Sequence, residues 1–323
     1  MQVHTTLTGP FPRSEALVAA TRDLDRGRTT PERVEELYQT TETAVVELEE
    51  RLRLDQRTGG YLRWADVFRP FAAGWGGFTV GPVTRWFETN TFYRQPILNA
   101  PPERVPGVVA RSLPVTPAAR GIARARVILP GPYTFAGLLD NRSGETTEGL
   151  VHRLGRLLAE ELRELRAVGY STIQFQEPLL VTAPPTGARA EAVVSAYKGL
   201  ATAADGLETH LWTFFGDAAP ALPLLLRLPV SVVGVDLSET DPASIGPLGD
   251  RRGLGLGVVD PRTTLVEDPA EVARVARGVA EKARPTSLWL GPGAPLDLLP
   301  WEPATRKLHL LPAAKQALEG GAR

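Results

Sequence analysis

Three segments of the chain repeat apolar residues every three or four positions, a spacing typical of helices with one buried face. The clearest follows Asp268-Pro269-Ala270-Glu271, a capping box with proline at the first helical position. A second covers residues 147–168 and ends at Gly169, and a third covers residues 31–54. We predict a helix in each segment.

Six short β-branched or apolar runs bounded by glycine or proline predict buried strands. They are residues 125–129, 172–175, 208–213, 231–235, 254–259 and 287–290. From residue 128 onward strands and helices alternate, which indicates a parallel sheet covered by helices. The sequence therefore predicts an α/β fold, a (β/α)8 TIM barrel formed as one domain by residues 1–323, with an aromatic-rich insertion near residues 70–100.

The composition of the chain excludes several classes of function. The 323 residues include 36 Lys+Arg, 37 Asp+Glu and no Cys. A net charge of −1 gives no overall attraction to phosphate backbones or anionic lipid, so we expect small-molecule substrates, without nucleic acid or membrane as partners. The lack of Cys excludes disulfides, thiol nucleophiles and cysteine-ligated metals. No apolar run approaches about 18 residues and no signal peptide is evident, so we expect a cytoplasmic location.

Polar side chains follow the predicted strands, at the end where such barrels carry their active sites. They are Arg13, Glu177, His210 with Trp212, Asp236 with Glu239, and Asp260 with Arg262. Four of them have a structural alternative. Asp236 and Asp260 could cap helices, Glu177 could brace Arg94 or Arg262, and His210 could be a hydrogen-bonded histidine without a role in the site. The aromatic segment 86–94 predicts either a wall for a flat heteroaromatic ligand or a hydrophobic plug over the barrel.

Several motifs occur in an order that resembles the catalytic domain of cobalamin-independent methionine synthase and its short single-domain relatives. They include residues 90–97, Gly131-Pro132-Tyr133-Thr134, residues 173–178, Thr209-His210 and residues 288–292. The resemblance implies a (β/α)8 barrel that moves a methyl group from a folate-type donor to homocysteine sulfur. It also implies a zinc ion that ionises the thiol.

The metal positions of that family are incomplete in this chain. His210 and Asp236 correspond to two ligands, whereas Trp212 and Ala294 stand at two cysteine positions and offer no metal-binding atom. We therefore expect a degenerate zinc site and assign no cofactor, although a weaker site of His210, Asp236 and possibly Glu239 stays open.

The same resemblance assigns roles to other positions. Glu177, His210, Asp260 and Arg262 are expected to be catalytic. The expected substrate-binding residues are Arg13, Tyr61, Trp86, Tyr93, Arg94, Gln176 and Trp212. Pro10, Tyr61, Gln176 and Arg262 replace a serine, two acids and a histidine of the family pattern.

The leading hypothesis is a methyltransferase-type enzyme that uses a folate-like or other donor and a small acceptor, with a degenerate zinc and homocysteine site. The alternative is a non-catalytic carrier or sensor on the same barrel. A third hypothesis, decarboxylation as in the uroporphyrinogen decarboxylase group, lacks that group's arginine-rich start. The sequence leaves the oligomeric state open.

Overall fold

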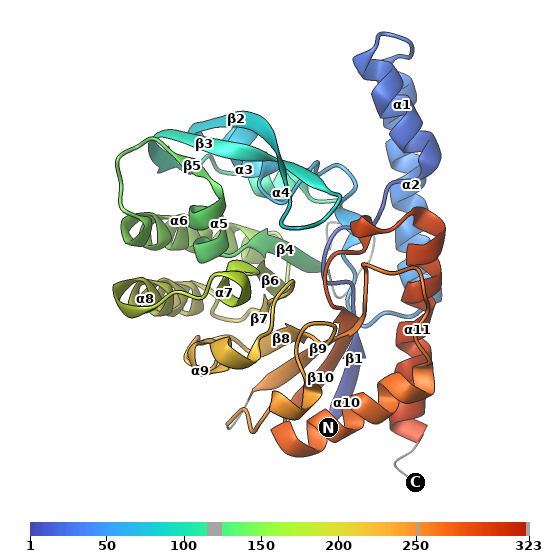
Figure 1. Ribbon diagram of the computed structural model, residues 1–323. Helices are drawn as coiled ribbons and strands as arrows, with labels where there is room; N and C mark the ends of the chain where they lie inside the picture. Colours follow the sequence, from blue (N-terminus) through green and yellow to red (C-terminus); the bar gives the residue numbers. More distant parts are fainter. Residues whose placement is uncertain (115–124, 250–251, 321–323) are drawn as a thin grey trace.

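The centre of the molecule is a curled sheet of seven parallel strands, seen in the computed structural model of residues 1–114, 125–249 and 252–320 (Figure 1). Its spatial order is β1 (Gln2–Thr5), β10 (Ser287–Pro292), β9 (Gly253–Val259), β8 (Val232–Asp236), β7 (Glu208–Trp212), β6 (Thr172–Gln176) and β4 (Arg126–Pro130). Two isolated parallel bridges, Thr6 with Gln56 and Arg57 with Ala125, link the edge strands β1 and β4. Residues 56–57 thus take the place of an eighth strand, and the predicted barrel fold is confirmed.

The helices lie outside the curled sheet, and some of them extend beyond it (Figure 1). They are α1 (Glu15–Asp25), α2 (Pro31–Arg51), α3 (Arg69–Gly74), α4 (Val108–Ser112), α5 (Pro132–Leu138), α6 (Thr147–Ala167), α7 (Leu179–Thr182), α8 (Gly187–Ala203), α9 (Leu222–Leu225), α10 (Pro269–Ala283) and α11 (Trp301–Gly320). The three predicted helices are confirmed as α2, α6 and α10. Within the described ranges, none of the helices is both long and apolar enough to cross a bilayer.

The predicted cap of α10 forms only in part. The Asp268 carboxylate accepts a hydrogen bond from the Ala270 N–H at 3.0 Å, which satisfies one of the free donors at the helix start. Glu271 turns outward to pair with Arg274 instead of reaching back to the cap. The helix therefore has a side-chain N-cap without the reciprocal bond of a capping box.

The aromatic-rich insertion is a long antiparallel ribbon beside the barrel. Strands β2 (Gly76–Arg85) and β3 (Phe92–Glu103) form it, and β5 (Asp140–Asn141) adds a short parallel edge. In Figure 1 this small sheet lies next to α5 and α6. Phe68, Phe71 and Phe78 pack against Phe135 of α5 and hold the ribbon there. The predicted excursion at residues 70–100 is confirmed.

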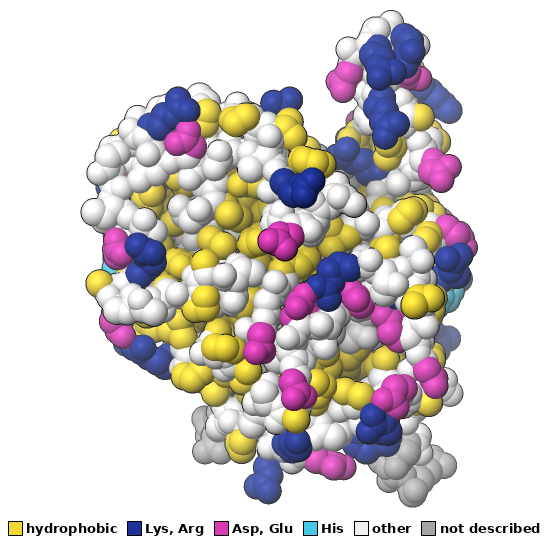
Figure 2. All heavy atoms as spheres, in the orientation of Figure 1, with side chains coloured by type: hydrophobic (Ala, Val, Ile, Leu, Met, Phe, Trp, Pro, Cys, Tyr) yellow, Lys and Arg dark blue, Asp and Glu magenta, His cyan; other side chains and the backbone are white. Residues whose placement is uncertain are grey.

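Helices α1 and α2 form a hairpin that projects away from the barrel (Figure 1). Buried Leu17 and Val34 lie inside the pair, and the hydroxyls of Ser14 and Thr30 cap the two helix starts. Figure 2 shows basic side chains gathered at the free end of the hairpin, where Arg26 and Arg28 are exposed. The hairpin is an addition to the plain strand–helix alternation that the sequence predicted.

Glycines on two neighbouring strands make room for Trp212 inside the barrel. The indole is fully buried. A Cβ atom at Gly234 or Gly255 would lie 2.2 or 2.3 Å from the indole ring, and one at Gly291 would lie 3.7 Å from it. Gly234 on β8 and Gly255 on β9 therefore have to stay small so that the ring can fill the lumen, whereas a Cβ at Gly291 on β10 would make ordinary contact with the ring and would instead clash with Thr8.

This packing predicts that Gly255→Ala destabilises the protein. The added methyl group would overpack the lumen, so we expect the free energy of unfolding in urea to fall by about 1–3 kcal/mol. The matched control is Gly278→Ala on α10, where an added Cβ meets nothing within 4 Å and should raise stability by up to about 1 kcal/mol. Equal stability of the two variants would contradict the packing argument.

Candidate functional site

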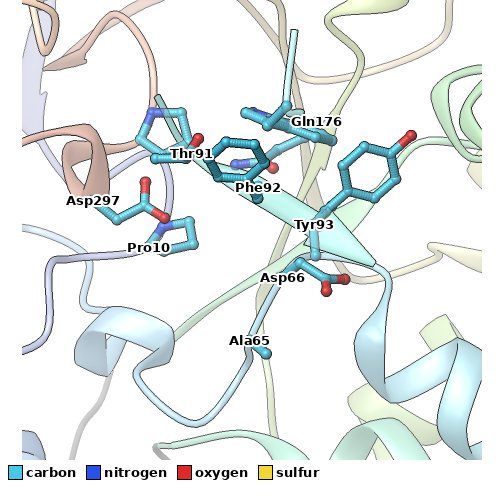
Figure 3. Close-up of a pocket in the computed structure, with 11 residues that line it drawn as sticks. Pro10, Ala65, Asp66, Thr91, Phe92, Tyr93, Gln176 and Asp297 are labelled. Atoms are coloured by element: carbon cyan, nitrogen blue, oxygen red, sulfur yellow. The ribbon is translucent and has the colours of Figure 1, made fainter. Parts of the chain in front are cut away.

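A hollow with a cavity volume of about 50 Å³ opens where the barrel strands end, between the loops after β1, β6 and β10 and the β2–β3 ribbon (Figure 3). We call it the mouth hollow. Its lining is Pro10, Ala65, Asp66, Val67, Trp86, Thr91, Phe92, Tyr93, Gln176, Pro295 and Asp297. Because barrel enzymes carry their active sites at this end of the strands, the mouth hollow is the candidate site.

Two carboxyl groups reach the mouth hollow, and they differ in what they bind. Both oxygens of Asp66 are used, by the backbone N–H groups of Phe68 at 3.0 Å and Arg94 at 3.2 Å and by the Arg69 guanidinium at 3.0 Å. The side chain of Asp297 is exposed in the hollow, and no other described residue donates a hydrogen bond to it. Loss of hydration between the surrounding walls raises the pKa of Asp297, and the charge of Arg13 opposes that rise.

The aromatic segment acts both as a plug and as a wall. Trp86 and Tyr93 are nearly buried and pack against Phe68, and the Tyr93 hydroxyl donates to the Leu138 carbonyl at 3.1 Å. Both rings also line the mouth hollow, together with half-exposed Phe92. The two interpretations of residues 86–94 are therefore compatible.

His210 lies inside the barrel lumen, not in the mouth hollow. It is fully buried, and its Nδ1 lies 2.8 Å from Nη2 of Arg126. A guanidinium only donates, so Nδ1 accepts and the ring proton sits on Nε2, which faces Glu208 at 3.3 Å. Burial, together with the Arg126 charge, lowers the pKa of His210 to about 3. His210 is thus a buried, hydrogen-bonded histidine that is neutral near pH 7, and its expected catalytic role stays a prediction.

Arg126 organises the lumen and was missed by the sequence analysis. Its guanidinium also donates to the side-chain oxygens of Gln56 at 2.6 Å and Gln174 at 2.7 Å, and it lies 5.0 Å above the Trp289 ring. Burial lowers the pKa of Arg126 to about 9, which leaves it charged near neutrality. An arginine within an otherwise apolar strand, residues 125–129, was the available signal. We call Arg126, Gln56, Gln174 and His210 the lumen cluster.

Glu177 points away from the barrel axis. The amide groups of Gln174 and Gln176 donate to the Thr8 carbonyl inside the barrel, and side chains alternate along a strand, so Glu177 faces outward. Its carboxylate accepts bonds from the N–H groups of Tyr133 at 3.0 Å and Thr134 at 2.7 Å, at the start of α5. Glu177 therefore caps α5 and braces neither Arg94 nor Arg262, and its expected catalytic role stays a prediction.

The Glu177 carboxylate caps α5 from a fully buried position, which disfavours its charged form. Tyr197 adds a third donor to the Glu177 carboxylate at 3.2 Å, and the residue is fully buried. Burial raises the pKa of Glu177 to about 7, because the three hydrogen bonds compensate only in part for lost hydration.

The remaining expected substrate-binding residues lie outside the lining of the mouth hollow. Tyr61 is buried and its oxygen accepts a bond from the Ile128 N–H at 2.6 Å. Arg13 donates to the Leu62 carbonyl at 2.9 Å. Arg94 is exposed on the ribbon and donates to the Gly81 carbonyl at 3.3 Å. Trp212 fills the lumen. Of the seven expected residues, the structure brings Trp86, Tyr93 and Gln176 together.

The expected catalytic pair Asp260 and Arg262 belongs to a separate ion-pair group. Arg262 contacts Asp260 at 3.1 Å and also contacts Glu239. None of the three lines the mouth hollow. Glu239, the possible third metal ligand, is therefore already paired with a cation.

The metal positions do not fit a zinc ion. Asp236 is buried, and its Oδ1 accepts a bond from the Ser238 N–H at 2.9 Å, while Oδ2 has no partner. Burial raises the pKa of Asp236. His210 is held by Arg126, and Trp212 and Ala294 supply no ligand atom. Throughout the three described ranges, no group of three or more His, Asp or Glu residues is placed to hold a metal. A neutral histidine and one carboxylate fall short of the three or four ligands that zinc takes.

A parallel barrel with a lined hollow at its strand ends defines an enzyme-type α/β barrel, and comparison with known proteins identifies its family. The family model described as "Cobalamin-independent synthase, N-terminal domain" matches residues 57–284, more than two thirds of the chain. The chain therefore belongs to the cobalamin-independent methionine synthase family, which is a family of methyltransferases. The matching model describes the family's N-terminal domain, whereas the sequence motifs suggested its catalytic domain.

Individual relatives agree with this assignment. The chain is 26% identical to a methionine synthase of Sulfurisphaera tokodaii, over 94% of this chain and 89% of that protein. It is 26% identical to a 5-methyltetrahydropteroyltriglutamate–homocysteine methyltransferase of Corynebacterium efficiens, over 97% of this chain but 43% of that protein. A B12-independent methionine synthase structure from Shewanella sp. W3-18-1 has the same fold, with a TM-score of 0.79, 17% identity and 99% of each chain covered.

The buried state of His210 predicts an acid-sensitive contribution to stability. Its folded pKa of about 3 lies below the usual 6.5, so the unfolded chain binds the extra proton between these values. Stability should therefore fall as the pH drops from about 6.5 toward 3, and the contribution is complete above pH 6.5. His210→Gln retains an acceptor for Arg126 but cannot titrate.

Urea unfolding of both proteins between pH 7 and pH 4 checks this prediction. We expect the wild type to lose more free energy of unfolding than His210→Gln on acidification. Parallel curves for the two proteins would show that His210 is not held neutral by its surroundings.

Proposed function

We propose that this chain binds a small methyl acceptor in the mouth hollow and takes part in methyl transfer from a folate-type or other donor, without a zinc-bound thiol. The observation that carries this proposal is the mouth hollow itself, where Gln176 lies at a strand end and no other described residue donates a hydrogen bond to the Asp297 side chain. Membership of a methyltransferase family supports the reaction type. Residues 1–323 act together as one unit, and the net charge of −1 favours small-molecule substrates over nucleic acid.

The expected site residues fall into two groups: residues that contact the ligand and residues that stabilise the barrel. Gln176, Trp86 and Tyr93 contact the ligand, and Asp297 joins them as the accessible carboxyl group. Glu177, His210, Tyr61 and Trp212 instead hold the barrel in shape, because their polar atoms or rings are buried in the packing described above. Phe92, which is half exposed beside the hollow, presents a ring face on which a flat donor can stack.

Zinc would supply thiolate formation in this family, but this chain's own donor set does not match that ion. Homocysteine methylation by the chain alone is therefore not part of the proposal. The named relatives are enzymes, and nothing in the comparisons favours the carrier or sensor alternative.

Titration calorimetry and a methyl-transfer assay test this function on the purified chain. We expect 5-methyltetrahydrofolate to bind, metal analysis to find less than one zinc per chain, and homocysteine to remain unmethylated. The matched variants are Asp297→Asn in the mouth hollow and Asp205→Asn, whose side chain is 94% exposed elsewhere. Asp297→Asn should lower acceptor turnover at least tenfold, and Asp205→Asn should leave it unchanged.

Two results would contradict the proposal. Stoichiometric zinc together with homocysteine methylation would show that the expected metal site is intact. Failure to bind or use any methyl donor would remove the methyl-transfer role.

A further inference from the structure

We propose that the mouth hollow selects a small amine that carries no carboxylate, so that its ligand is a simple amine and not an α-amino acid. This inference rests on the proposed function, because it names the class of acceptor held in the same hollow. It follows from the charges, the unused hydrogen-bonding atoms and the apolar surface of the lining.

The charges of the lining all have one sign. Asp66 and Asp297 are the charged residues, and the lining contains no Lys, Arg or His. Arg13 is the cation whose charge acts on Asp297, but its guanidinium is bonded to the Leu62 carbonyl and lies 5.6 Å from the Tyr38 ring centre. The Asp66 charge is already paired with Arg69, so a ligand carboxylate would approach Asp297 without a lining cation to receive it, whereas an ammonium group is attracted to Asp297.

Gln176 adds a buried acceptor at the same place. It is only 2% exposed, and its amide contacts the Thr8 carbonyl at 3.0 Å. Because a carbonyl oxygen only accepts, that contact must be made by the amide nitrogen, which leaves the amide oxygen at the other end. No described residue donates to this oxygen. This oxygen is therefore an acceptor that a ligand N–H group entering the hollow can use.

Most hydroxyl donors of the lining are already used. Thr89 gives its single proton to the Trp86 carbonyl at 2.6 Å, so the Thr91 hydroxyl must donate to Thr89 at 2.8 Å. The Tyr93 hydroxyl donates to the Leu138 carbonyl. The indole N–H of Trp86 remains, and one neutral donor does not offset a carboxylate. The hollow therefore accepts hydrogen bonds more readily than it donates them.

The rest of the surface suits a short organic cation. Pro10, Val67 and Pro295 form apolar sides, and Figure 3 shows the Phe92 ring lying among Thr91, Tyr93 and Gln176. Aromatic faces stabilise cations when water is displaced. A cavity volume of about 50 Å³ restricts the hollow to a small group or to one end of a ligand.

Three ligands that share a methylthiopropyl chain but differ in their charged groups test this selectivity. They are 3-(methylthio)propylamine, methionine, which adds a carboxylate, and 3-(methylthio)propanol, which replaces the ammonium by a hydroxyl. Because the pKa of Asp297 is raised to about 7, titration calorimetry of the full chain is done at pH 8, where this carboxyl group is charged. We expect the amine to bind at least tenfold more tightly than methionine or the alcohol. Added salt should weaken the binding of the amine.

The variant Asp297→Asn tests whether Asp297 is responsible for the affinity for the amine. Asp297→Asn keeps the shape of the side chain but removes its charge, so the affinity for the amine should fall by about tenfold, as expected for loss of a charge-assisted hydrogen bond. Asp205→Asn makes the same change at a fully solvated position and should bind the amine like the wild type. Because no other described residue donates a hydrogen bond to the Asp297 side chain, both variants should show wild-type thermal melts.

Several results would overturn the inference. They are methionine binding as tightly as the amine, no detectable binding of the amine, or unchanged amine affinity in a folded Asp297→Asn variant. The outcome is separable from the proposed function. Methyl transfer with an amino acid acceptor would remove the amine selectivity alone, whereas amine selectivity without any use of a methyl donor would remove the methyl-transfer role alone.

Discussion

A guanidinium group enclosed in the barrel constrains the rest of this molecule. An unpaired buried charge is strongly unfavourable, so Arg126 requires acceptors on several strands at once. Gln56, Gln174 and His210 provide them, and each is thereby committed to the lumen cluster. Above this layer, Trp212 fills the remaining width. Because the lumen is filled, the space left for a ligand lies in the mouth hollow, between the strand ends and the aromatic ribbon.

The fold could be predicted because its signals are local. Apolar runs ended by glycine or proline predicted β4, β6, β7, β8, β9 and β10, and helical periodicity predicted α2, α6 and α10. The eighth strand position escaped prediction because residues 56–57 form only isolated bridges and carry no apolar run. The projecting α1–α2 hairpin was also missed, because a helical period does not show where a helix pair lies relative to the sheet.

The site was harder to predict because strand alternation decides which side chains share a space. Gln176 and Glu177 are adjacent in sequence, yet one lines the mouth hollow and the other caps α5 on the outside of the sheet. A shift of one residue in that alternation exchanges their roles. His210 matched a family ligand by position, but its partner Arg126 lies 84 residues away. Asp297 lies three residues beyond Ala294, where motif comparison stopped.

The two isolated bridges at residues 56–57 leave the barrel with a weak longitudinal seam. Every other neighbouring pair of strands in this sheet shares a ladder of at least three residue pairs, whereas β1 and β4 meet through single bridges on either side of this segment. Local opening begins where the fewest backbone bonds must break. Amide protons along this seam should therefore exchange with solvent before those of the opposite wall. Water would then enter the barrel from the side, next to the enclosed guanidinium.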